Sequence, residues 1–179
     1  MRRVLNYVLR ESQYYPTPEQ LVEDILYRLE RDWDVEEMHI LEPCAGDGAI
    51  CRVMKEKFED ATIDCLEIEP VLRDSLRGQG FNVIGEDFET FESMPFYDLI
   101  FMNPPFSKGA NFLLRAYDLL NANGRLICLL NAETVKNPFT KERERLNALI
   151  EKCGEVEFLE NGFSKGKRKT DVEIAVVVV

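Results

Sequence analysis

Short apolar runs alternate with amphipathic helical segments along most of this chain, and this alternation limits the folds that it can adopt. Seven runs have strand character: residues 39–41, 62–66, 81–84, 97–102, 125–130, 156–159 and 172–179. Between most of them, apolar residues recur at helical spacing, for example in the predicted helices 108–121 and 141–152. Helices that connect successive strands produce a mostly parallel sheet with both faces covered. We therefore expect an α/β, doubly wound sheet of seven strands.

Three details refine this expectation. The last two runs have no helix between them, so we expect an antiparallel pair in which the last strand is reversed. A helix start is predicted at residues 17–20: Thr17 is a cap, Pro18 suits the first helical position, and Gln20 completes a capping box. Asn123-Gly124 predicts the end of the helix that begins at Lys108. Ligands in such sheets bind beyond the carboxyl ends of the strands, where the strand order reverses.

Composition indicates the number of domains and the cellular location of the protein. The chain has 179 residues, 45% of them hydrophobic, and we expect a single domain over 1–179. No apolar stretch is long enough for a membrane span, and the N-terminus lacks the features of a signal peptide. Five scattered cysteines without a C-x-x-C motif predict reduced thiols, a cytoplasmic location and no metal site.

The net charge of −11 argues against a broad nucleic-acid surface, but one local basic segment stands out. Its cations are Lys165, Lys167, Arg168 and Lys169. If the strand at 156–159 is parallel to its neighbours, this loop leaves the sheet at the ligand-binding edge. We therefore expect these cations to hold phosphate, and a solvated hairpin tip is the alternative.

The most informative motif for function is Asn103-Pro104-Pro105-Phe106, which directly follows the apolar run 97–102. Each proline fixes its own φ and lacks an N–H, and Pro104 also restricts Asn103 to extended conformations. The turn is therefore stiff and presents an amide, carbonyl oxygens and an aromatic ring at the end of a strand. Such a corner suits a flat heterocycle that carries an amino group.

Acidic residues follow the first three predicted strands, at Glu42, Glu67 and Asp87, and Asp47 lies nearby. Gly46 and Gly48 form a glycine-rich turn between the first strand and its helix, where the backbone can approach a ligand closely. Cys51 occupies the position where the dinucleotide-binding pattern has a third small residue. An acidic rim disfavours a pyrophosphate and suits a cofactor with an ammonium and a sulfonium.

With these motifs the chain resembles class I methyltransferases that use S-adenosylmethionine, and in particular those that methylate the exocyclic N6 of adenine in nucleic acids. The resemblance rests on Tyr14-Tyr15-Pro16-Thr17-Pro18, on 42–48, on Glu67 and Asp87-Phe88, and on 103–106. It implies a Rossmann-like sheet and a cofactor site formed by Tyr15, Thr17, Glu42, Cys44, Ala45, Gly46, Asp47, Gly48, Glu67, Ile68, Asp87, Phe88 and Asn103. It implies that Asn103, Pro104 and Phe106 are catalytic.

The acceptor stays open at this stage. DNA adenine is the first expectation and RNA the second, and this order rests on the Tyr15-Pro16-Thr17-Pro18 motif. No separate target-recognition domain fits within the chain, which leaves a small DNA enzyme, a partner subunit that supplies recognition, and RNA recognised by shape as alternatives. Guanine N2 in RNA and a protein glutamine amide also present a planar amine. A non-catalytic cofactor-binding subunit is the remaining alternative, against which the intact Asn103 and Glu67 argue.

Overall fold

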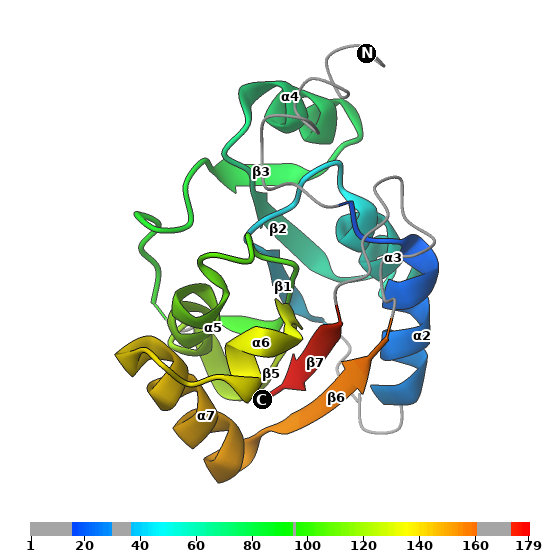
Figure 1. The fold of residues 1–179 in the computed structure, drawn as a ribbon. Coiled ribbons are helices and arrows are strands. Elements are labelled where there is room, and N and C mark those ends of the chain that lie inside the picture. The colour runs from blue at the N-terminus through cyan, green and yellow to red at the C-terminus, as the bar shows by residue number, and fades with distance from the viewer. Residues whose placement is uncertain (1–15, 30–36, 95, 161–172) are drawn as a thin grey trace.

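The fold is a mixed sheet with helices on both faces, shown in Figure 1 as a computed structural model that describes residues 16–29, 37–94, 96–160 and 173–179. Within these residues, the sheet has seven strands in the order β3-β2-β1-β4-β5-β7-β6. The strands are β1 His39–Glu42, β2 Thr62–Leu66, β3 Asn82–Gly85, β4 Tyr97–Met102, β5 Leu120–Asn131, β6 Glu155–Leu159 and β7 Ile174–Val178. The predicted doubly wound α/β architecture is confirmed.

Strand directions also agree with the sequence. The pairs β1–β2, β2–β3, β1–β4 and β4–β5 are parallel, whereas β7 is antiparallel to both β5 and β6. β6 therefore runs in the same direction as β5, and its carboxyl end lies at the same edge of the sheet. The strand order reverses between β1 and β4, which places the expected ligand crevice at their carboxyl ends.

Each central strand is apolar on both faces because both faces are covered. In β4, Leu99 and Phe101 join one core cluster, and Ile100 and Met102 join the other. The first cluster packs under α2 Glu19–Leu29, α3 Ala49–Lys57 and α4 Pro70–Gly78, and the second under α5 Gly109–Tyr117 and α7 Lys141–Cys153. The short helix α6 Ala132–Lys136 contacts α7 and β5 (Figure 1).

The helix predicted over 108–121 is shorter than expected. Helix α5 ends at Tyr117, and β5 already begins at Leu120. The carbonyl of Leu119 accepts the N–H groups of Phe96 and Tyr97, at 3.0 and 3.1 Å, so the chain has joined the sheet before the predicted stop. Asn123 has a positive φ of 70°, and it lies in an irregular stretch of β5 rather than at a helix end.

Two further helix predictions needed correction. The first described helix begins at Glu19, one residue later than the pattern suggested, and the Pro18 carbonyl accepts the N–H groups of Leu21 and Val22. The sequence pattern predicts no helix at 132–136, where the structure has α6, because five residues are too few to show helical spacing. Among the described residues, the helices are too short or too polar to cross a bilayer.

Candidate cofactor and acceptor site

A pocket lies at the carboxyl ends of β1, β2, β3 and β4, at the point where the strand order reverses. The predicted site residues that line it are Thr17, Glu42, Cys44, Ala45, Asp47, Glu67, Ile68, Asp87, Phe88, Asn103, Pro104 and Phe106. The structure therefore brings the two predicted halves of the site, the glycine-rich turn and the prolyl corner, into one pocket. Gly46 and Gly48 form the turn beside it.

The glycine-rich turn requires its glycines. Gly46 and Gly48 have φ values of 54° and 85°, in the left-handed region that side chains disfavour. Gly48 is the N-cap of α3. A Cβ at Gly48 would lie 2.9 Å from a side-chain carbon of Leu76. The turn is also tied to β2, because the Ala45 N–H donates to the Leu66 carbonyl at 2.9 Å.

Glu67 fixes the end of β2 against this turn. Its Oε2 accepts the Gly46 N–H at 2.6 Å, and its Oε1 accepts the Glu69 N–H at 2.8 Å. The side chain is almost fully buried, and burial raises its pKa, whereas the two backbone hydrogen bonds partly lower it. Both oxygens keep lone pairs that can accept hydroxyl groups, since a carboxylate offers about four acceptor sites.

Glu42, at the end of β1, serves the scaffold as well as the pocket. It is 2% exposed, and its Oε2 accepts the Cys51 N–H at 3.0 Å and the Cys51 thiol at 2.8 Å. Burial raises the pKa of Glu42 well above its ordinary value, although the Cys51 bonds favour the ionised form. This residue therefore joins the first turn of α3 to β1 at the floor of the site.

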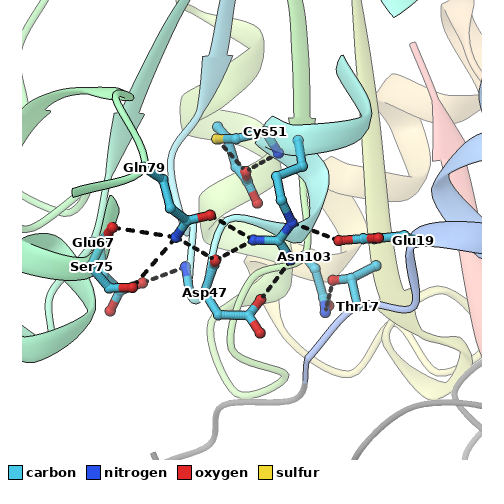
Figure 2. Close-up of polar contacts among 11 residues, drawn as sticks. Thr17, Glu19, Asp47, Cys51, Glu67, Ser75, Gln79 and Asn103 are labelled. Atoms are coloured by element: carbon cyan, nitrogen blue, oxygen red, sulfur yellow. Dashed lines mark hydrogen bonds and ion pairs between the residues drawn. The ribbon is translucent and has the colours of Figure 1, made fainter. Parts of the chain in front are cut away.

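A polar network on the outer side of the turn was not predicted, and Figure 2 shows its labelled members Glu19, Asp47, Ser75 and Gln79. Arg52 is its centre: Nη1 donates to the Asp47 carbonyl at 2.6 Å and to Gln79 Oε1 at 2.9 Å. Its Nε donates to Glu19 Oε1 at 2.6 Å. The network joins α2, α3 and α4 around the turn. No spacing in the sequence indicates it, because the partners come together only in the fold.

Asn103 directly follows the strand β4 and lines the pocket, half-buried. Its Nδ2 donates to Thr17 Oγ1 at 3.0 Å, a contact between residues 86 positions apart that Figure 2 shows. Phe106 lines the pocket and also packs against the core cluster under α2 and α3. The Pro105 carbonyl accepts the Lys108 N–H at 2.9 Å, which leads the prolyl corner into α5.

The opposite end of the pocket is aromatic and acidic. Phe88 is buried and meets Phe112 edge-to-face at 5.3 Å between ring centroids, and Asp87 Oδ1 accepts the Glu89 N–H at 2.9 Å. Ile68 lines the pocket with 60% of its surface exposed, which offers an apolar face to a flat ring. Lys108 lines the pocket too and is ion-paired with Glu89; neither Lys108 nor Phe112 was predicted.

Several predicted site residues lie outside the described residues: Tyr15 and the four cations Lys165, Lys167, Arg168 and Lys169. The ends of the flanking strands are described. Leu159 of β6 pairs with Ile174 of β7, and Ile174 pairs with Asn131 at the carboxyl end of β5. Among the described residues, no group of three or more His, Cys, Asp or Glu side chains is arranged to hold a metal ion.

Comparison with known proteins gives structural likeness only. No protein-family model matches the sequence, and no curated protein is similar to it in sequence. A class I S-adenosylmethionine-dependent methyltransferase structure from Listeria monocytogenes has a TM-score of 0.70 at 13% identity, over 99% of this chain and 65% of its own. A type I restriction-modification methyltransferase subunit from Streptococcus thermophilus has a TM-score of 0.65 at 15% identity, over 92% and 44%.

A third structure matches over nearly its whole length. This S-adenosylmethionine-dependent methyltransferase from Methanococcus maripaludis has a TM-score of 0.59 at 14% identity, over 99% of this chain and 90% of its own. The chain thus spans 65% of the Listeria protein and less than half of the Streptococcus subunit. Together with the strand order, these likenesses show that the chain has the Rossmann-like fold of class I S-adenosylmethionine-dependent methyltransferases.

Proposed function

We propose that this protein is an S-adenosylmethionine-dependent methyltransferase that methylates the exocyclic N6 of adenine in a nucleic acid, with DNA as the first candidate and RNA as the second. One observation carries the proposal. The acidic glycine-rich turn and the Asn103-Pro104-Pro105-Phe106 corner line the same pocket, at the edge where this fold places its ligands.

The residues of the pocket fit the cofactor. When bound, S-adenosylmethionine supplies a methyl group activated by a positively charged sulfur. Glu42, Asp47, Glu67 and Asp87 give the pocket the negative charge that favours a cationic ligand. Glu67 is held by two backbone N–H groups in an orientation that offers acceptors to ribose hydroxyls. The exposed face of Ile68 suits the flat adenine of the cofactor.

The prolyl corner fits the acceptor. An adenine amino group is a weak nucleophile, because its lone pair is shared with the ring. The Asn103 side-chain oxygen and the Pro104 carbonyl would each accept one of its N–H groups, which increases electron density on nitrogen and orients it for attack. This is preorganisation rather than removal of a proton by a strong base. Phe106 would stack on the base, and a base in a duplex would first flip out.

The choice of nucleic acid rests on the N-terminal Tyr15-Pro16-Thr17-Pro18 motif and on one structural relative. That relative is a methyltransferase subunit of a restriction-modification system, which is consistent with DNA and with a partner subunit for recognition. A protein that needs such a partner would modify DNA poorly alone. The cations at 165–169 are proposed to bind phosphate next to the flipped nucleotide.

The test of the proposal is the destination of the methyl group. Purified protein is incubated with methyl-labelled S-adenosylmethionine and separate pools of DNA, RNA and protein. Label in N6-methyladenine of DNA or RNA is the expected result. Label in guanine or in protein glutamine would replace the proposed acceptor. Cofactor binding without label in any pool would indicate a subunit that is non-catalytic or that methylates only with its partner.

Two variants sharpen this test. Asn103→Ala should bind S-adenosylhomocysteine about as well as the unchanged protein and lose turnover, because the change removes an acceptor for the amine. Replacing Lys165, Lys167, Arg168 and Lys169 with Gln should flatten the slope of log affinity for nucleic acid against log salt concentration, since fewer counterions are released. An unchanged slope would remove the basic segment from the proposed interface.

A further inference from the structure

Thr17 and Asn103 lie 86 positions apart in the chain and meet at the pocket. The Nδ2 of Asn103 donates to Thr17 Oγ1 at 3.0 Å, and both residues line the pocket (Figure 2). In the sequence, Thr17 was expected to contact the cofactor or to cap α2. The structure gives its hydroxyl a different partner, namely the side chain proposed to hold the acceptor amine.

The direction of this hydrogen bond matters because an amide has two unlike ends. With its nitrogen turned toward Thr17, the planar amide of Asn103 carries its oxygen on the other side. An amino group of the substrate needs an acceptor, so the oxygen must be the end that it meets. A rotated amide would place its NH₂ against the substrate's NH₂, donor against donor, although the threonine hydroxyl, which both donates and accepts, could bond either end of the amide.

Thr17 is itself held in place by the scaffold. It directly precedes Pro18, whose carbonyl accepts the N–H groups that begin α2. Two residues after Thr17, Glu19 is bonded to Arg52, which also holds the Asp47 carbonyl in the glycine-rich turn. The threonine hydroxyl therefore occupies a position that is fixed relative to both halves of the site.

We infer that Thr17 is a positioning residue, which holds the Asn103 side chain at the pocket so that its amide can meet the acceptor amine. This inference deepens the proposed function and rests on it. It differs from the expectation that Thr17 contacts the cofactor, because removal of the hydroxyl then slows methyl transfer and leaves cofactor affinity largely unchanged.

The experiment compares Thr17→Val, which keeps the shape and removes the hydroxyl, with Thr17→Ser, which keeps the hydroxyl. The single-turnover rate of methylation of the nucleic acid that accepts label is measured at saturating S-adenosylmethionine. The Kd for S-adenosylhomocysteine is measured by calorimetry. We expect Thr17→Val to slow the single-turnover rate about tenfold, which corresponds to about 1.4 kcal/mol. Its Kd should change less than twofold, and Thr17→Ser should restore most of the rate. Thr62→Val, a change of the same size at the opposite end of β2, is the matched control.

A second readout does not depend on activity. In the protein without cofactor, the side-chain amide resonances of Asn103, assigned by their loss in Asn103→Ala, should exchange faster with water in Thr17→Val than in the unchanged protein. If Thr17→Val does not fold, Thr17→Ala makes the same comparison.

The outcomes separate the inference from the proposed function. A weaker Kd with an unchanged rate at saturation would make Thr17 a cofactor contact and overturn the inference. Equal slowing in Thr17→Val and Thr17→Ser would do the same, since the hydroxyl would then be irrelevant. If Thr17→Val is fully active while Asn103→Ala is inactive, only the inference fails. If Asn103→Ala keeps its turnover, the proposed role of the prolyl corner itself fails.

Discussion

Arg52 supports the glycine-rich turn from outside the pocket, and its removal gives the most detailed prediction. The guanidinium bonds the Asp47 carbonyl at 2.6 Å, Gln79 at 2.9 Å and Glu19 at 2.6 Å. Arg52→Met keeps the apolar stem of the side chain and removes all three contacts. We expect both the stability of the fold and the affinity for S-adenosylhomocysteine to decrease.

The magnitude follows from the contacts. A hydrogen bond from a charged donor contributes about 1.5–3 kcal/mol when it is well buried, and the Asp47 carbonyl is only partly so. Its second partner, the Gln79 amide at 3.2 Å, remains in the variant and reduces the loss. The pair with Glu19 is exposed and adds less than about 1 kcal/mol. A total of about 2 kcal/mol should lower Tm by about 4–8 °C for a chain of this size.

Arg77 provides a matched control. Its side chain is 55% exposed and pairs with Asp74 at 3.3 Å on the surface of α4. Arg77→Met should therefore lower the free energy of unfolding by less than about 0.5 kcal/mol. Urea unfolding measures the free energies, and calorimetry measures the affinity for S-adenosylhomocysteine, which should weaken about tenfold in Arg52→Met alone. If the two variants unfold at the same urea concentration, the network does not support the turn and the reasoning fails.

Three further predictions address the pocket itself. Glu67→Gln should weaken S-adenosylhomocysteine binding about tenfold or more in calorimetry, because one of the two backbone N–H groups loses its acceptor; an unchanged Kd would contradict this. Gly48→Ala should cost about 2–4 kcal/mol in urea unfolding, since its φ is 85° and a side-chain carbon lies 2.9 Å from the added Cβ. Gly78→Ala, with open space around it, should be neutral or stabilising. For Glu42→Gln, the free energy of unfolding should increase relative to that of the unchanged protein as the pH rises above about 4.5, the ordinary pKa of the carboxyl. The buried acid holds its proton more tightly when folded, so the unchanged protein loses stability between that value and its raised pKa. Parallel stability curves would show that Glu42 carries no such cost.

The strands could be predicted because their apolar runs are short and bounded by turn residues. The run 97–102 matches β4 at both ends, and the antiparallel direction of β7 follows from the missing helix before it. The end of α5 could not be predicted in this way. Leu119 and Leu120 continue the helical spacing, and only their pairing beside Tyr97 shows that the chain has entered the sheet.

The candidate site was predictable where a motif is continuous in sequence. The turn 42–48 and the corner 103–106 each carry their geometry in their own glycines and prolines. Contacts between distant segments carry no such signal. The Arg52 network and the Thr17–Asn103 bond depend on how α2 packs beside α3, which the fold decides and a local pattern does not show.

The position of β7 between β5 and β6 has a consequence for synthesis on the ribosome. β6 leaves the ribosome before β7, yet among the described strands it pairs with β7 alone. Until residues 174–178 are free to pair, the backbone N–H and C=O groups along one edge of β5 have no strand partner in the nascent chain. The parallel strands β1 to β5 can therefore pair before β7 is made, whereas β6 joins the sheet only once β7 is in place.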